Sequence, residues 1–149
     1  MGIEALSRGA KHATFVDNSR ESIRCIHQNL EALGIERCSK VIYADVFAAM
    51  RKLAKTSSGF DVIYADPPYD TPVQGKQKKH SFSTEVLAVL DELIESGLFL
   101  VKPGGAVFLE DASDSLPEEQ VFKHLFLKEK RTMGRSALQH WELKIQNTG

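Results

Sequence analysis

The chain has 149 residues, of which 42% are apolar and 26% charged, and this length and composition are typical of a single globular domain spanning residues 1–149. No apolar run reaches the ~20 residues of a transmembrane helix, and no signal peptide opens the chain. The two cysteines, Cys25 and Cys38, form no CxxC pair, so neither a disulfide framework nor a metal site is expected. We expect a cytoplasmic, monomeric protein without membrane contact.

Short β-rich segments alternate with segments of helical periodicity, a pattern typical of a parallel α/β sheet with crossover helices. Helices are predicted at residues 2–8, closed by Gly9, then from an N-cap at Asn18 to Gly34, from Val46 to about residue 53, and at 86–94. Strands are predicted at 12–16, 40–44, 61–65 and, after a turn at 102–105, at 106–110. A polar loop is expected at residues 70–81.

The alternation with helices stops after residue 110. Residues 122–130 and 136–145 are predicted to be two consecutive strands. In the second of them, Trp141, Leu143 and Ile145 alternate with polar residues, as in a strand with one buried face. The fold is therefore expected to be α/β, with a mostly parallel sheet that ends in an antiparallel pair.

Three of the predicted strands end in an aspartate: Asp17, Asp45 and Asp66. Ligands of open α/β sheets bind outside the carboxyl ends of the strands. Asp17 sits where an acidic residue binds the ribose diol of an adenosine cofactor, and Asp45, with Val46 beside it, is placed to contact an adenine ring. The alternative interpretation of each aspartate is a helix cap or a turn residue. For Glu110, at the end of the fourth strand, a turn or cap role is preferred, and the alternative is that it lines the same crevice.

The tetrapeptide Asp-Pro-Pro-Tyr at residues 66–69 is the strongest chemical signal in the chain. Pro67 and Pro68 fix the backbone, so the turn presents the Asp66 carboxylate and the Pro67 carbonyl as rigid acceptors beside the Tyr69 ring. This combination suits a planar ring that bears an amino group, because the ring stacks on Tyr69 while its two amino hydrogens meet the two acceptors. The alternative is a purely structural turn.

Such a site favours methyl transfer to the amine. An aromatic amine is a weak nucleophile because its lone pair is delocalised into the ring, and acceptors outside the ring plane localise that pair. Attack on the methyl group of a sulfonium moves positive charge to nitrogen, where a fixed carboxylate and carbonyl stabilise it. Neither a metal nor a covalent nucleophile is needed, and Asp66 or solvent takes the proton.

Three segments carry a resemblance to a known family: GIEALSRGAKHATFVDNSRESI, DVIYADPPYD and LVKPGGAVFLED. Through them the chain resembles the RsmD-type family of bacterial rRNA guanine-N2 methyltransferases over residues 2 to about 112. The resemblance implies a Rossmann-like class I fold, S-adenosylmethionine (SAM) as cofactor, and ribosomal RNA or the small-subunit particle as substrate. It assigns base binding to Asp66, Pro67, Pro68 and Tyr69, and SAM binding to Gly2, Asp17, Asn18, Asp45, Val46 and Asp66.

The resemblance also implies elements that precede this chain. Members of the family have a first strand that ends in a glycine loop of Asp-Leu-Phe-Ala-Gly-Ser-Gly type. Gly2 of this chain matches only the last glycine of that loop. Without that central strand, its two neighbours would have unpaired edges. We therefore expect this chain by itself to bind SAM weakly, and a micromolar affinity in calorimetry would contradict that expectation.

A group of lysines, Lys76, Lys78 and Lys79, follows the Asp-Pro-Pro-Tyr motif. The net charge of −1 gives no indication of a nucleic-acid partner. Lysines at this position would nevertheless meet the phosphates that flank a flipped-out base. The alternative is an ordinary solvated lysine-rich loop.

Other functions fit parts of the sequence. DNA adenine-N6 methyltransferases use similar motifs, but the chain has no room for their usual target-recognition domain. A catalytically impaired remnant that only binds RNA would fit the lack of a first strand. A nicotinamide-dependent oxidoreductase would also place an acid at Asp17, yet it does not explain the motif at residues 66–69. Methylation of a guanine amino group in small-subunit rRNA is therefore the preferred hypothesis.

Overall fold

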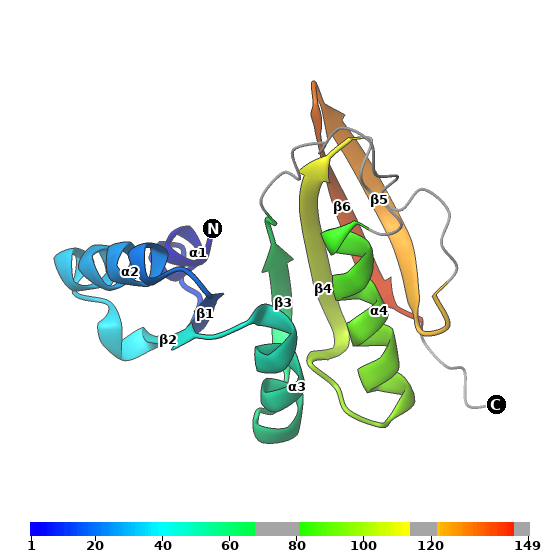
Figure 1. Cartoon of the computed structure of the whole chain (residues 1–149), viewed down its shortest axis with the longest axis horizontal. Coiled ribbons are helices and arrows are strands. Elements are labelled where there is room, and N and C mark those ends of the chain that lie inside the picture. Colours follow the sequence, from blue (N-terminus) through cyan, green and yellow to red (C-terminus); the bar gives the residue numbers. More distant parts are fainter. Residues whose placement is uncertain (68–80, 114–121, 145–149) are drawn as a thin grey trace. The chain divides into compact units, whose positions relative to one another are not determined.

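The computed structural model describes residues 1–67, 81–113 and 122–144 (Figure 1). The chain divides into two compact units, Met1–Lys52 and Leu53–Gly149, and each is described by itself. In the described ranges, no helix combines the length and the apolar character that crossing a membrane requires.

The first unit contains a parallel pair of strands with helices around it. Its elements in chain order are α1 (Gly2–Ser7), β1 (Ala13–Asp17), α2 (Arg20–Leu33), a 3-10 turn η1 (Glu36–Cys38), β2 (Ser39–Tyr43) and the larger part of α3 (Val46–Thr56). β1 and β2 run parallel, with Ala13 opposite Ser39 and Asp17 opposite Tyr43. The predicted helices and strands of this half are thus confirmed, apart from the short turn η1.

The start of α2 differs from the prediction by one residue. The N-cap is Ser19, whose hydroxyl accepts a hydrogen bond from the Ser22 amide at 3.3 Å, and not Asn18. The physical reason is that the Asp17 carboxylate accepts the Ser19 amide at 2.7 Å, which turns the chain before the helix begins. The end of α2 is as predicted, because Gly34 adopts the left-handed conformation (φ 66°) that closes a helix.

The second unit is a four-stranded sheet covered by one long helix. Its elements are β3 (Phe60–Ala65), α4 (Phe82–Glu95), β4 (Val101–Ala112), β5 (Leu125–Met133) and β6 (Ser136–Leu143). The strand order is β3-β4-β6-β5. β3 and β4 are parallel, whereas β6 is antiparallel to both β4 and β5. The antiparallel pair predicted for the end of the chain is therefore confirmed.

The predicted turn at 102–105 lies inside β4 and does not precede it, which corrects the sequence-based boundary. Phe60 pairs with Val101 and Val62 with Ala106, so β4 advances five residues while β3 advances two. Gly104 (φ 79°) absorbs the irregularity. A side chain at Gly105 would meet the Asp61 carbonyl at 2.7 Å, so glycine is required where the two backbones approach.

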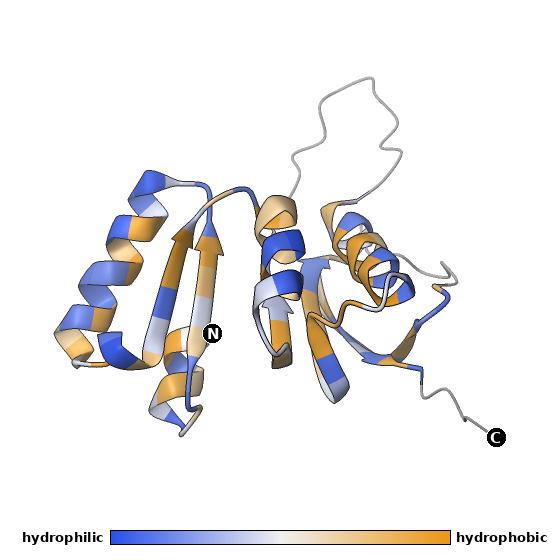
Figure 2. Ribbon diagram, turned by 90° about the horizontal axis from the view of Figure 1, so that it is seen from below, coloured by the Kyte–Doolittle hydropathy of each residue, from blue (hydrophilic) through white to orange (hydrophobic). Residues whose placement is uncertain are grey.

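The core of the second unit lies between α4 and one face of the sheet. The helix contributes Val86, Leu87, Leu90 and Leu93, and the sheet contributes Val107, Leu109 and Trp141, all of them buried. Figure 2 shows the same division, with apolar residues prominent in the strands and hydrophilic bands on the helices. Because side chains alternate along a strand, the neighbours of these buried residues in β4 point to the opposite face.

Four of the described strands, β1, β2, β3 and β5, lie at a sheet edge and have one neighbour each. Among the described strands, β1 pairs with β2 alone and β3 pairs with β4 alone. Backbone groups at these two edges are therefore available for pairing with a further strand.

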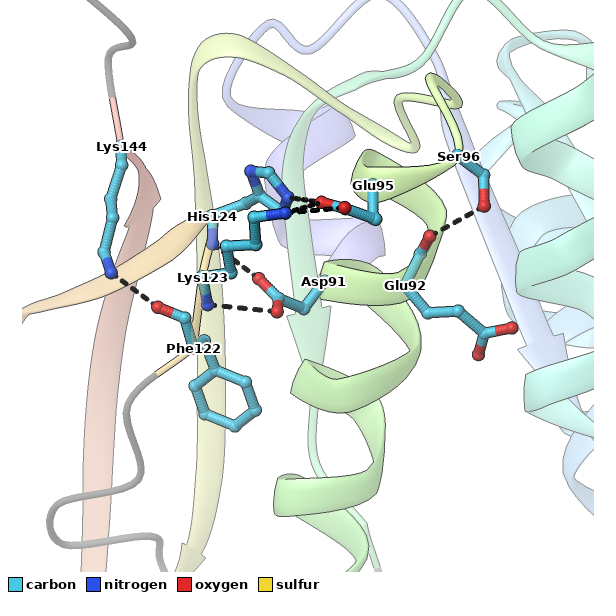
Figure 3. A network of polar contacts seen from close by, with 8 residues as sticks. All are labelled: Asp91, Glu92, Glu95, Ser96, Phe122, Lys123, His124 and Lys144. Carbon is cyan, nitrogen blue, oxygen red and sulfur yellow. Dashed lines mark hydrogen bonds and ion pairs between the residues drawn. The ribbon is translucent and has the colours of Figure 1, made fainter.

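A polar network ties the last turns of α4 to the start of β5 (Figure 3). The Asp91 carboxylate accepts the backbone amides of Lys123 at 3.1 Å and His124 at 2.7 Å. One turn later, Glu95 accepts hydrogen bonds from the side chains of the same two residues. These bonds, above all the one from Lys123, hold the pKa of Glu95 below its ordinary value.

Replacing Asp91 by alanine is expected to lower the free energy of unfolding by about 1–3 kcal/mol, because two backbone amides lose their acceptor. Urea denaturation monitored by circular dichroism measures this change. The matched control is Asp61→Ala, which removes an exposed ion pair with Lys102 and is expected to stay within about 0.5 kcal/mol. Equal effects of the two substitutions would contradict the anchoring role of Asp91.

Candidate active site

The carboxyl edge of the β1–β2 pair brings Asp17 and Asp45 together. Asp17 is the last residue of β1 and stands opposite Tyr43, and Asp45 follows the end of β2 by two residues. The Ala44 amide donates to the Asp17 carbonyl at 3.1 Å, which joins the two chain segments at this edge. The ends of β1 and β2 therefore lie side by side at one edge of the pair.

Each of the two carboxylates also has a local structural role. Asp17 Oδ1 accepts the Ser19 amide at 2.7 Å, and Asp45 Oδ2 accepts the Ala48 amide at 2.9 Å in the first turn of α3. One oxygen of Asp17 thus has the role of a turn residue, and one oxygen of Asp45 has the role of a helix cap. In the part of the chain that the structure describes, the second oxygens make no hydrogen bond, so both remain able to accept one from a ligand.

The other predicted cofactor residues lie around the same strands. Asn18 is exposed and directly follows Asp17, and Val46 is the half-buried first residue of α3. Gly2 opens α1 and packs on β1, where a side chain would lie 2.5 Å from the Phe15 ring. Gly2 therefore has a packing role that the sequence analysis did not consider.

The predicted catalytic motif begins at the carboxyl end of β3 in the second unit. Asp66 directly follows the strand and is exposed, and Pro67 is buried. Pro68 and Tyr69 lie outside the described residues, as do Lys76, Lys78 and Lys79. The structure therefore gives the position of the carboxylate and of the first proline of the motif.

Two consecutive acidic residues end β4 beside Asp66, and they point to opposite faces of the sheet. On one face, the Tyr64 hydroxyl donates a hydrogen bond to Glu110 Oε2. On the face that α4 covers, the buried Asp111 accepts the Ser83 hydroxyl at 2.8 Å and the Ala112 amide at 2.7 Å. The ends of β3 and β4 and the start of α4 are thereby tied together.

The environment of Asp66 favours its protonated form more than water does. Partial burial raises the pKa of Asp66, and the negative charges of Glu110 and Asp111 raise it further. An ionised Asp66 at this edge would be stabilised by a ligand that donates hydrogen bonds or carries positive charge. A carboxylate in these surroundings is therefore suited to an amine that becomes cationic during reaction.

The family model described as "Conserved hypothetical protein 95" matches residues 1–142. The chain belongs to this family. The resemblance to RsmD-type proteins that the sequence motifs suggested is thereby confirmed.

One relative and two solved structures are similar to this chain. "Putative rRNA methyltransferase YlbH" of Bacillus subtilis is 35% identical over 118 residues, which cover 79% of this chain and 57% of that protein. "Putative methyltransferase yhhF" from Escherichia coli superposes with a TM-score of 0.70 at 21% identity, over 97% of this chain and 70% of that one. The chain therefore spans a little over half the length of the Bacillus relative, and the likeness to solved structures confirms the predicted methyltransferase-type α/β fold.

A second similar structure was solved with SAH. "SMU.776, a putative methyltransferase complexed with SAH" matches over 93% of this chain and 41% of its own, with a TM-score of 0.62 and 14% identity. At that identity the likeness concerns the fold.

At the carboxyl ends of β3 and β4, two polar residues of the candidate site were not predicted from the sequence, and a third was assigned the wrong role. Tyr64 and Asp111 were not identified, and Glu110 was given a turn or cap role although it lies within β4. The alternation of buried and half-buried residues along 106–112 is the signal that would have placed Glu110 and Asp111 on opposite faces.

Proposed function

We propose that the protein is a SAM-dependent methyltransferase that modifies the N2 amino group of a guanine in small-subunit ribosomal RNA. The observation that carries the proposal is the placement of Asp66 and Pro67 at the end of β3, beside Glu110, in a chain that is 35% identical over 118 residues to a protein named "Putative rRNA methyltransferase YlbH". An acceptor pair at the end of a parallel strand is the arrangement that an amino group requires.

SAM fits the donor and acceptor set of the β1–β2 edge. The second oxygen of Asp17 would accept the ribose hydroxyls, and that of Asp45 would accept the adenine amino group. Val46 would cover the adenine face, and Gly2 and Asn18 would line the same edge. Support for this cofactor also comes from the related fold of SMU.776, which was solved with SAH.

When bound, SAM supplies an electrophilic methyl group on a sulfonium. Asp66 and the Pro67 carbonyl would orient the target amine by accepting its two hydrogens, and Tyr69 would hold the base by stacking. Positive charge would develop on the amine nitrogen during transfer. The Asp66 carboxylate would stabilise that charge and would receive the proton, directly or through water.

Contacts to the RNA backbone are proposed for Lys76, Lys78 and Lys79, which directly follow the motif in the sequence. Phosphates on either side of an extruded base would lie within reach of such a segment. Binding that weakens with salt is the expected signature of these contacts.

The proposal is tested by methyl transfer from radiolabelled SAM to four substrates: under-methylated small-subunit particles, free small-subunit rRNA, large-subunit rRNA and DNA. The chain is assayed alongside a version extended N-terminally by the first strand and glycine loop of the family. Nucleoside analysis is expected to find N2-methylguanosine in small-subunit rRNA. N6-methyladenine in DNA would support the alternative function, and no transfer by either version would support a remnant that only binds RNA.

A further inference from the structure

The side chain of Glu110 is fixed beside the proposed target site. In β4, Val107, Leu109 and Asp111 are buried toward α4, so Glu110 points to the other face of the sheet. Ala65 pairs with Leu109, so the next positions along the two parallel strands are Asp66 and Glu110. The Tyr64 hydroxyl, two residues before Asp66, bonds Glu110 Oε2 and limits the rotamers of this carboxylate.

One oxygen of Glu110 remains available for a ligand. The Tyr64 hydroxyl donates to Glu110 Oε2, and in the described residues no other hydrogen bond involves Glu110. The mechanism derived for Asp66 and Pro67 does not use this carboxylate. The Glu110 carboxylate is a negatively charged acceptor next to the amine-binding position, so it would bind a second hydrogen-bond donor on the substrate.

Guanine carries such a donor next to its amino group, and the other amino-bearing purines do not. Its N1–H lies directly beside the N2 amine on the same edge of the ring. In adenine and in 2-aminopurine, the ring nitrogen at this position is an acceptor, which a carboxylate would repel. Hydrogen bonding to a ring N–H at this edge is thus a physical means of distinguishing the bases.

We propose that Glu110 is a specificity-determining residue whose carboxylate accepts the N1–H of the target guanine while Asp66 accepts its N2 amine. This inference rests on the proposed function, because it names the base that the Asp66 site receives. Tyr64 is a positioning residue that orients Glu110 from the neighbouring strand.

The test compares the binding of two nucleosides to the full chain by NMR shift perturbation: guanosine and 2-aminopurine riboside. Both carry the 2-amino group, and they differ at N1 and at the 6-oxygen. The unmodified protein is expected to bind guanosine about tenfold more tightly. Glu110→Gln is expected to bring the ratio to about one, because the carboxamide keeps the shape and the Tyr64 contact but also donates to an N1 acceptor.

Two further variants separate recognition from local charge and from folding. Asp111→Asn removes a negative charge on the face that α4 covers and is expected to leave the guanosine preference unchanged. Tyr64→Phe keeps the Glu110 charge but frees its rotamer, and is expected to reduce the preference only in part. Thermal melts of all variants check that each is folded.

The outcomes distinguish this inference from the proposed function. A guanosine preference that survives in Glu110→Gln, or its absence in the unmodified protein, overturns the role of Glu110. If the preference depends on Glu110 while guanine in rRNA receives no methyl group, the recognition role stands and the proposed reaction fails. If methylation occurs and the ratio does not change in the variant, only the present inference is wrong.

Discussion

Substitution of Asp66 by alanine is expected to lower kcat for methyl transfer to rRNA by about 10³-fold, while the Kd for SAM stays within about twofold of the original value. The carboxylate is the fixed charge beside the nitrogen on which positive charge develops. Its loss removes stabilisation that exists mainly in the transition state, so the effect falls on kcat. In the proposed function the cofactor would be held mainly by the other strand ends, so its affinity is expected to be largely retained.

Single-turnover methyl transfer and calorimetric SAM titration measure the two parts of this expectation. The control is Asp61→Ala, at the opposite end of β3, where the carboxylate is exposed and pairs with Lys102. That variant is expected to retain nearly full activity. Normal turnover in Asp66→Ala would show that the motif has a structural role and would refute the proposed site.

The pH dependence gives an independent measurement on the same residue. In the proposed function the ionised form of Asp66 would accept the amine hydrogens, and burial together with Glu110 and Asp111 raises the pKa of Asp66. Activity is therefore expected to fall as the pH drops through this raised pKa, at a higher pH than an ordinary aspartate would show. Glu110→Gln removes one of the causes and should move the acidic limb of the profile to lower pH.

The strands of the fold were predictable because their signal is local. Apolar runs bounded by aspartate or glycine fixed the positions of β1, β2 and β3 to within about a residue. The boundaries that failed depend on partners elsewhere. The predicted turn at 102–105 lies inside β4 because β3 pairs with β4 on both sides of it. The N-cap of α2 is Ser19 and not Asn18, because the Asp17 carboxylate accepts the Ser19 amide.

The candidate site was predictable to the same extent. Convergence of Asp17 and Asp45 follows from the rule that parallel strands end at one edge, which requires only the order of the elements. The contact between Tyr64 and Glu110 joins residues 46 positions apart and requires the register of β3 against β4. A one-residue shift of that register would turn Glu110 to the opposite face, and no local pattern fixes it.

Asp17 offers the second large effect, because its two oxygens have separable roles. Asp17→Asn keeps an acceptor for the Ser19 amide at Oδ1, so the start of α2 and the melting temperature are expected to be preserved. The negative charge that would bind the ribose diol is lost, and hydrogen bonds to charged groups contribute about 1.5–3 kcal/mol. The SAM affinity is therefore expected to fall by roughly 10- to 100-fold.

Calorimetric titration of SAM into the chain and into the N-terminally extended version measures this loss. Asp45→Asn is the matched comparison, because it also removes a charge at the same strand edge while one oxygen still accepts the Ala48 amide. Since Asp45 would meet the adenine amino group through a single hydrogen bond, its loss is expected to be about tenfold or less. The residue that binds the ribose diol makes the two stronger hydrogen bonds. A larger loss of SAM affinity in Asp45→Asn than in Asp17→Asn would therefore assign the ribose to Asp45 and the adenine to Asp17.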